Sequence, residues 1–449
     1  MESMMNAYCL FFIAALCCSN GVAFEAPNTS SHLHNMDQQS PAKSSSTPKL
    51  TTNHIGIFYE PGMPARSGAE NILALHSGVS FMEEKVLGTS WLSDGDILGK
   101  SCNIAGRFAK YFLVDIPINF LFIVVNHEFY GHASRYREFD LDPIDYHFET
   151  PPIYGPGGGF AHVSSYPRPM SNHELLAIWQ GGFEAHNLLN RRLSMRWIAD
   201  KRINYHESIL YLWTWQDRFQ YIQGANEKLP ADLSGELFDP EGYVWFLNKS
   251  AGYDNPHNLY FSMADLKRKD QMNLINPFVW IALFTQFKSY LYDGNRTATL
   301  PMLRFGEIDY LPSLRMSLTP FGPQYHVENY LRWRRTTSLI ELRIGDQTFH
   351  KDWWGIGLLL QNIYEKKQFS FDLHLDVWRQ PQLEINGTSV TASDAEFGLA
   401  FSIRGYYDVL PTKLPLSLIA EMGYKSTGYI QGYVLDATPK FMLGIGLRK

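Results

Sequence analysis

The sequence predicts an α+β fold in which a helical domain is followed by an antiparallel β-barrel, which we expect to span a membrane. Up to about residue 311 the apolar residues recur with the period of a helix, whereas from residue 312 onward apolar and polar residues alternate. A short apolar segment at the N-terminus precedes both parts. Aromatic residues make up 14% of the 449 residues, which fits interfaces and membrane belts as well as cores.

The composition excludes some classes of protein. Apolar residues make up 45% of the chain and charged residues 19%, so the chain can bury a large core and is not disordered as a whole. The net charge is −6 and the sequence contains no long run of Lys or Arg, so nucleic acid is not an expected partner. The length is sufficient for two or three domains.

The N-terminal segment has the features of an export signal. The apolar run at residues 7–18 is followed by Gly21-Val22-Ala23, an acceptable cleavage site, and the run is too short to cross a membrane. We therefore expect residues 1–23 to be cleaved as a signal peptide. Residues 24–53 are rich in Ser, Thr and Pro and are predicted to form a flexible linker. Cleavage would leave Cys102 as the last cysteine, and we expect its thiol to be buried and inert.

Residues 54–311 are predicted to form the helical domain. Four apolar segments of helical length lie in this part, at residues 108–132, 175–192, 206–223 and 278–292. Between the first two, residues 151–169 are dense in Gly and Pro, which indicates a shaped surface loop.

Residues 312–449 are predicted to form the barrel. In Phe369–Val377 every odd residue is apolar and every even one polar, so we expect Phe369 and Leu375 to face outward and Ser370 and Asp372 inward. About eight strands are expected, near residues 314–318, 327–335, 339–344, 353–364, 369–377, 397–404, 416–423 and 441–448, with 429–435 as a further candidate. Such strands are typical of transmembrane barrels, although a soluble antiparallel sheet alternates in the same way. The export signal and the aromatic strand ends favour the membrane.

The segment that most clearly indicates a metal site is Asn126–His132, which reads NHEFYGH. Zinc peptidases commonly carry H-E-x-x-H on one helix, where both His bind the ion and the Glu activates the zinc-bound water. Here His132 lies five positions after His127, which would set the two rings about 140° apart on a regular helix. A single π-turn absorbs the extra residue. We therefore expect one wide turn in this helix and a shared Zn2+ ion.

The form H-E-x-x-G-H resembles the zinc motif of the dipeptidyl peptidase III family, which has the same insertion and a Gly before the second His. In that family a Glu on a downstream helix supplies the third ligand, and Glu184 lies 52 residues after His132. The resemblance therefore implies that His127, His132 and Glu184 bind the metal and that Glu128 is the catalytic base. It is confined to these two short motifs, and Phe183 stands where the second motif of the family has a Glu.

His162 is a second candidate catalytic residue, because it could donate a hydrogen bond to a developing oxyanion, although a role in shaping its loop fits equally well. These observations predict an exported zinc metallopeptidase that acts on a peptide or protein substrate. The expected location is the outer membrane or the periplasm of a Gram-negative bacterium. Two alternatives stay open: a polytopic membrane metalloprotease, and a non-enzymatic outer-membrane β-barrel protein whose histidines are structural.

Overall fold

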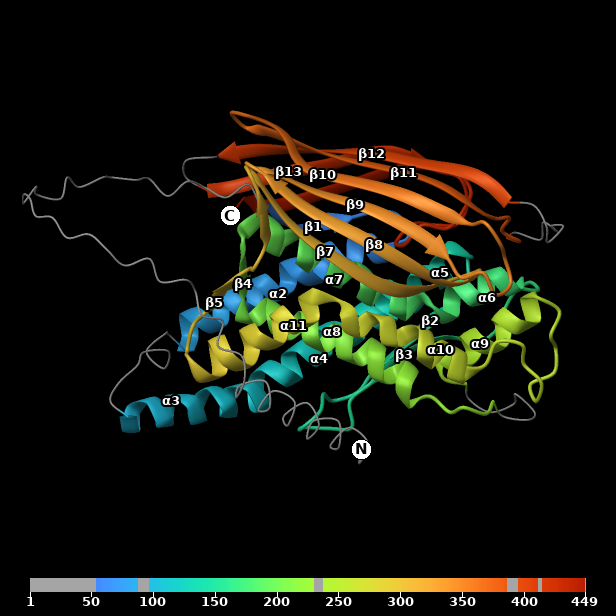
Figure 1. The fold of residues 1–449 in the computed structure, drawn as a ribbon, viewed down its shortest axis with the longest axis horizontal. Coiled ribbons are helices and arrows are strands. Elements are labelled where there is room, and N and C mark those ends of the chain that lie inside the picture. The colour runs from blue at the N-terminus through green and yellow to red at the C-terminus, as the bar shows by residue number, and fades with distance from the viewer. Residues whose placement is uncertain (1–53, 88–96, 230–236, 386–394, 411–413, 449) are drawn as a thin grey trace, which may run out of the picture. The chain divides into compact units, whose positions relative to one another are not determined.

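Helices and strands are arranged in two layers, with one large sheet lying over the helices (Figure 1). The structure is a computed structural model that describes residues 54–87, 97–229, 237–385, 395–410 and 414–448. The predicted signal peptide and linker lie outside the described residues. Residues 52–449 form one compact unit, and the boundary predicted between residues 311 and 312 falls inside the strand Ile308–Thr319. The helices and the sheet are therefore two layers of one unit and not successive domains.

The helical layer contains the four helical segments expected from the sequence. The helices are α2 (Ala65–Leu87), α3 (Ile97–Lys110), α4 (Ile116–His127), α5 (Ala133–Glu138), α6 (Asn172–Trp179), α7 (Gly181–Asp200), α8 (Tyr205–Gly224), α9 (Asp239–Ser250), α10 (Met263–Asp270) and α11 (Pro277–Phe284). Wider π-turns occur at η2 (Tyr111–Asp115), η3 (Glu128–His132) and η5 (Thr285–Tyr292), and a tighter 3-10 turn at η4 (Gln271–Ile275). A capping box between Ser171 and Glu174 begins α6, because each side chain accepts a hydrogen bond from the backbone of the other.

The sheet is antiparallel and open. Its strands are β1 (His54–Tyr59), β6 (Leu303–Phe305), β7 (Ile308–Thr319), β8 (Gly322–Trp333), β9 (Thr336–Gly345), β10 (Trp354–Lys366), β11 (Phe369–Pro381), β12 (Ala395–Leu410), β13 (Leu414–Lys425) and β14 (Thr438–Arg448). They lie in the order β1-β14-β13-β12-β11-β10-β9-β8-β7-β6, with neighbours antiparallel. The predicted closed barrel is wrong, because β1 and β6 are opposite edges and no pairing joins them within the described strands. Helices pack on the inward face of the sheet, on the side that a closed barrel would enclose. For example, α7 contacts β7, β8 and β9.

Two further pairs of strands are short and lie away from the large sheet. They are β2 (Ile144–Phe148) with β3 (Gly159–Val163), and β4 (Arg202–Asn204) with β5 (Thr297–Thr299). Residues 429–435, the additional strand candidate, form turns instead, and Tyr429 and Leu435 are buried. Their apolar side chains pack in the core between the sheet and the helices, which accounts for the strand-like composition.

The two faces of the sheet have opposite polarity, and the apolar face is the exposed one. On β11 the outward Phe369 and Leu375 are 49% and 40% exposed, whereas the inward Ser370 and Asp372 are 5% and 8% exposed. The predicted orientation of this strand is confirmed. A soluble sheet that packs on helices normally buries its apolar face, so this arrangement is the reverse of the usual one.

Charged side chains on the inward face are paired across the two layers. Glu70 of α2 accepts hydrogen bonds at 2.7 Å from Arg192 of α7 and from Arg404 of β12. Arg404 also donates to Glu421 of β13 at 2.8 Å, and Glu421 pairs in turn with Arg66 of α2. Because removing one partner of a buried ion pair costs about 3–5 kcal/mol, this network holds the sheet in one register on the helices.

One continuous helical run, Gly99–Glu138, is apolar and long enough to cross a membrane by length and composition, with a mean hydropathy of 1.8 in its most apolar window. A core helix passes the same test, and α4 within this run packs on α7 and α8. The run also carries the buried pair of Lys110 and Asp115. It therefore belongs to the helical layer. Cys102 lies on α3 and is exposed, so the expectation of a buried thiol is wrong.

Candidate metal centre

The helix that carries the His motif contains the wide turn expected from the sequence. The regular helix α4 ends at His127, and η3 continues it as a π-turn from Glu128 to His132. The extra residue between the two histidines is absorbed there, which confirms the prediction. As a result both imidazoles lie on one side of the helix, with their Nε2 atoms 3.1 Å apart.

Asp239, the first residue of α9, completes a group of three ligand atoms. Its Oδ2 atom lies 3.0 Å from Nε2 of His127 and 3.0 Å from Nε2 of His132. Atoms bound to one tetrahedral zinc ion at 2.0–2.1 Å are roughly 3.3 Å apart, so the three atoms have nearly the spacing of a zinc site. The set of two imidazoles and one carboxylate is also a common ligand set for catalytic zinc and for iron.

The hydrogen bonds of His132 direct its Nε2 atom into this group. Its Nδ1 atom lies 2.8 Å from the carbonyl oxygen of Ile178, and because a carbonyl only accepts, Nδ1 carries a proton. Nε2 lies 3.0 Å from the carboxylate of Asp239, which only accepts when it is ionised, so a second proton or a metal cation must lie between them. The group therefore fits either an imidazolium or a bound metal ion.

The charges around the group favour a cation. Burial opposes a charge on His132, but Asp239 outweighs it and raises the pKa of His132 to about 9. Burial opposes a charge on His127 as well, but the hydrogen bond to Asp239 and the charge of Glu128 outweigh it and raise the pKa of His127. Conversely, burial alone would raise the pKa of Asp239, but the two imidazoles hold it well below its usual range. The site therefore stabilises positive charge.

Three glycines allow the two helices of the site to approach each other closely. A Cβ atom on Gly131 of η3 would lie 2.7 Å from Cα of Gly182 and 2.8 Å from O of Gly181, both on α7. A Cβ on Gly182 would lie only 2.2 Å from Nε2 of His127. The backbone of α7 therefore forms the floor under the His127 ring, and no larger residue fits at Gly182.

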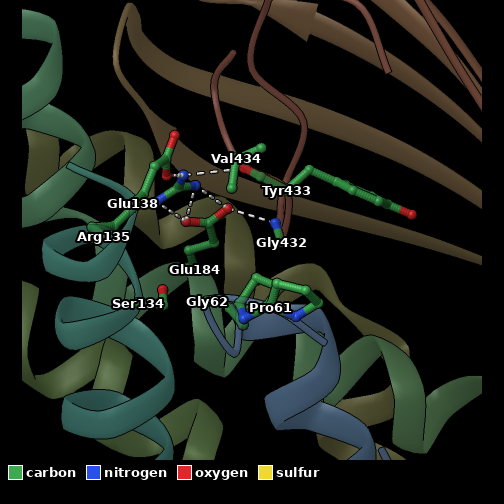
Figure 2. A pocket seen from close by; sticks show the side chains of 11 residues that line it. Pro61, Gly62, Ser134, Arg135, Glu138, Glu184, Gly432, Tyr433 and Val434 are labelled. Carbon is green, nitrogen blue, oxygen red and sulfur yellow. Dashed lines mark hydrogen bonds and ion pairs between the residues drawn. The ribbon is translucent and has the colours of Figure 1, made fainter. Parts of the chain in front are cut away.

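Glu184, the third ligand that the family resemblance implied, is not brought to the two histidines. Figure 2 shows its carboxylate beside the guanidinium of Arg135, below the turn at Gly432. Arg135 Nη2 donates to Oε2 at 2.6 Å and to Oε1 at 2.8 Å, and the backbone N–H of Gly432 donates to Oε1 at 2.6 Å. This carboxylate is committed to a bidentate ion pair. Asp239 lies beside the two histidines, where the resemblance placed Glu184.

The sequence offered little that could have indicated Asp239. It lies 107 residues after His132, far outside the spacing of the zinc motifs considered above. Asp before Pro at the start of a helix is also a common arrangement, because an acidic residue stabilises the first turn. The feature that sets Asp239 apart is its burial, at 8% exposed, which depends on tertiary packing.

Glu128 lies at the site and is held by the backbone of β3. Its Oε2 atom accepts a hydrogen bond at 2.8 Å from the N–H of Ala161, and its side chain is buried. His162, the next residue on β3, is exposed whereas Ala161 is buried, so the two side chains lie on opposite faces of the strand. The structure therefore places Glu128 beside the histidines and does not bring His162 to them.

A second group of possible ligands shares His127. Nδ1 of His186 lies 3.6 Å, and Nδ1 of His127 lies 4.0 Å, from Oδ2 of Asp217 on α8. Both Nδ1 atoms are buried without a hydrogen-bond partner. His186 is 0% exposed, and its Nε2 is 3.2 Å from the carbonyl oxygen of Ile123, to which it donates. Asp217 thus lies where a carboxylate could accept the Nδ1 proton of His127 through a small shift or a water, which would leave Nε2 of His127 to a metal.

A third group, Glu83, Asp115 and His206, is already neutralised by a cation of the protein itself. The ammonium of Lys110 lies 2.8 Å from Glu83 and pairs with Asp115. This group is therefore not a candidate metal site.

Comparison with known proteins returns no relative of this chain. No protein-family model matches it, and no curated protein and no solved structure matches it significantly. The functional argument consequently rests on the geometry of the site.

Proposed function

We propose that the protein is a metal-dependent hydrolase whose metal ligands are His127, His132 and Asp239. The observation that carries the proposal is the convergence of the three ligand atoms within 3.0–3.1 Å, with Glu128 as the neighbour of His127 in the chain. Zinc is the ion that this ligand set suits best, and a bound zinc ion would supply a Lewis acid and lower the pKa of a water bound to it.

Each residue has a distinct part in this proposal. Glu128 is the general base, because one carboxylate oxygen is fixed by Ala161 and the other, Oε1, would accept a proton from the attacking water and pass it to the leaving group. His132 is oriented by its bond to Ile178, and Asp217 would orient His127. Arg135 and Glu184 support the helix behind the site.

A peptide is the proposed substrate class. β3 has a strand partner on one side only, β2, and the N–H of Ala161 points away from that partner toward Glu128. Because Glu128 already accepts from the N–H of Ala161, an extended peptide would use the other backbone groups of this edge for its hydrogen bonds, in a common mode of peptide recognition. We also propose that the protein is exported and lies in a membrane through its sheet.

The first experiment measures bound metal in the purified full-length protein. Wild type is expected to hold one equivalent of zinc, and Asp239→Asn to lose it. Glu184→Gln is the matched control, since it also neutralises a buried acid near the site, and it is expected to keep the zinc. Retention by Asp239→Asn, or loss by Glu184→Gln in a folded protein, would restore Glu184 as the third ligand.

The second experiment separates binding from catalysis. Glu128→Gln should keep the zinc and lose hydrolysis of a peptide library, by about 10²–10⁴-fold if the base carries its usual share. A Glu128→Gln protein that cleaves as fast as wild type would show that Glu128 is not the base.

A non-enzymatic membrane protein with a structural metal is the second candidate. It is favoured by the burial of the ligands, since the side chains of His127, His132 and Asp239 are only 7–11% exposed. Structural metal sites contribute folding energy. This candidate predicts that a chelator unfolds the protein and that wild type cleaves no peptide. The hydrolase predicts that the chelator abolishes cleavage while most of the fold remains.

A further inference from the structure

The outward face of the sheet is apolar over six neighbouring strands. More than twenty large apolar side chains of the sheet are exposed, and every strand from β9 to β14 contributes to them. Examples, one from each of these strands in chain order, are Ile344, Ile356, Val377, Phe397, Met422 and Ile445. On β11 the outward positions from Phe369 to Val377 are all apolar, and the first outward charge is Arg379. Exposed apolar patches of such extent mark a surface that is covered by something else.

The apolar band is tall enough to cover most of a membrane interior. On β11 it runs from Phe369, which pairs with Tyr407, to Val377, and Arg379 next to Phe397 lies just beyond it. Eight residue steps from Phe369 to Val377 cover ~26 Å along the strand, or ~20 Å across a membrane if the strand is tilted as in outer-membrane barrels. Aromatic side chains mark the strand ends, including the contact of Phe369 with Tyr407, whose ring centroids are 5.0 Å apart. Aromatic girdles at both limits of an apolar band are typical of lipid-facing sheets.

The limits of the apolar face favour lipid over a second copy of the chain. On the neighbouring strands β11 and β12 the apolar positions end at paired residues, with Phe369 opposite Tyr407 at one limit and Arg379 opposite Phe397 at the other. A band with such regular limits is typical of a sheet that faces the hydrocarbon layer, whereas an interface between two copies needs no even band.

The two free edges of the sheet are sealed by side chains of the helices. At one edge, Asn71 of α2 accepts from the N–H of Phe58 at 2.7 Å and donates to the carbonyl of Phe58 at 3.0 Å. At the other edge, β6 pairs with β7 only at Ile308–Tyr310, and the rest of β7 has no strand on this side within the described residues. There Asn273 of η4 accepts from the N–H of Met316 at 2.9 Å, and Arg218 of α8 donates to the carbonyl of Met316 at 3.4 Å. An open edge is not tolerated in hydrocarbon, because its backbone groups would lack partners. Helices supply those partners here.

We propose that the outward apolar face of β9 to β14 contacts the acyl chains of a bilayer, with the strand ends at the limits of the hydrocarbon layer and the helices on the side of the sheet that faces away from the lipid. This inference rests on the membrane location proposed above and specifies the surface that meets the lipid. It does not depend on the metal site.

The test measures the depth of single spin labels in the full-length protein, reconstituted in vesicles of phosphatidylcholine and phosphatidylglycerol. Labels replace Leu375 at mid-strand, Tyr407 at a strand end and Arg268 on α10, which is exposed on the helical side, each in a background in which Cys9, Cys17, Cys18 and Cys102 are replaced by Ser. Accessibility to oxygen relative to a water-soluble nickel complex is expected to be highest at Leu375, intermediate at Tyr407 and lowest at Arg268.

The outcomes distinguish the proposed lipid-facing surface from the proposed membrane location. If the protein does not associate with the vesicles, both the membrane location and the lipid-facing surface are refuted. If it associates but the label at Leu375 is as exposed to the nickel complex as the label at Arg268, the surface is refuted and the location stands. If instead the labels at Leu375 couple to one another between two chains, the face is an interface between copies and the lipid contact is refuted.

A second measurement does not depend on labels. Leu375→Arg places a charge at the middle of the proposed hydrocarbon layer and is expected to lower the equilibrium constant for folding in vesicles on the order of 30- to 900-fold. Tyr407→Arg, at the strand end, is the matched control and should change it by less than about tenfold. Equal effects at the two positions would contradict the proposed depth.

Discussion

A substitution at Gly182 should disturb the site, because the ring of His127 occupies the space that a side chain at this position would need. In Gly182→Ala the new Cβ would lie 2.2 Å from Nε2 and 2.3 Å from Cε1 of His127, whereas an ordinary contact is at least 3.4 Å. The ring would have to move by about 1.2 Å. Metal–nitrogen bonds tolerate only about 0.2 Å of variation, so His127 would be lost as a ligand. We expect zinc affinity to fall by at least about 100-fold, since perturbing even the supporting contacts of a ligand costs about 10- to 100-fold.

The assay for this prediction is zinc binding in competition with a chromogenic chelator, together with urea unfolding of the same samples. Overpacking of this kind is expected to cost about 1–3 kcal/mol of stability. Gly78→Ala on α2 is the matched control, because nothing lies within 4 Å of its added Cβ; it should bind zinc normally and gain up to about 1 kcal/mol.

A double mutant keeps the prediction testable even if Gly182→Ala folds poorly. In a His127→Ala background the clash is absent, so Gly182→Ala should cost much less stability than it does in wild type. The reasoning would be refuted by a folded Gly182→Ala protein with wild-type zinc affinity, or by a stability cost that is the same in both backgrounds.

Three other measurements test the packing around the site. Glu184→Gln should leave Arg135 short of its main partner and lower the free energy of unfolding by about 3 kcal/mol while zinc is retained, and an unchanged urea midpoint would contradict this. Burial lowers the pKa of His76 from its usual 6.5 to about 4, so the unfolded state binds one more proton between those values, and stability falls as the pH is lowered through this window. The loss from His76 should reach about 3 kcal/mol, and His76→Gln should reduce the pH slope of the unfolding free energy by up to one proton; an identical slope would show that His76 protonates equally in both states. Asn71→Leu should leave the N–H and the carbonyl of Phe58 without partners and cost about 2–6 kcal/mol in urea unfolding, whereas a neutral effect would mean that water or lipid-side groups seal this edge.

The elements of the fold could be predicted because their signals are local. The alternation in Phe369–Val377 marks a strand and its two faces without reference to any other part of the chain, and the structure has both as expected. Whether the sheet closes into a barrel cannot be predicted in this way, because closure depends on which elements pack on the inward face of the sheet. Asn71 lies on the helix that follows β1, 13 residues after Phe58, and Asn273 lies 43 residues before Met316. Nothing in the strand sequences indicates that either side chain bonds to a strand edge.

The same distinction applies to the site. The wide turn between His127 and His132 follows from helix geometry alone, because two side chains five positions apart can face one ion only if the helix widens between them. The third position depends on how α7 and α9 pack against that helix. The family resemblance implied Glu184 on α7, but the guanidinium of Arg135 pairs with that carboxylate, and Asp239 of α9 lies beside the two histidines. The tertiary neighbours of a buried acid decide whether it forms an ion pair or lies at a possible metal site.

The pairing of β1 with β14 has a consequence for the order in which the protein can be made. Gly56, near the start of the described chain, lies opposite Gly446, near its end, and the sheet continues without a gap from one to the other. During synthesis β1 is the first strand of the sheet to emerge from the ribosome, but its strand neighbour β14 is the last of the described strands to appear. The sheet therefore cannot be completed before residues 438–448 have been made. A nascent chain that stalls just before residue 438 would leave β1 without its strand partner and β13 unpaired on one side, and we expect it to be degraded rather than to accumulate.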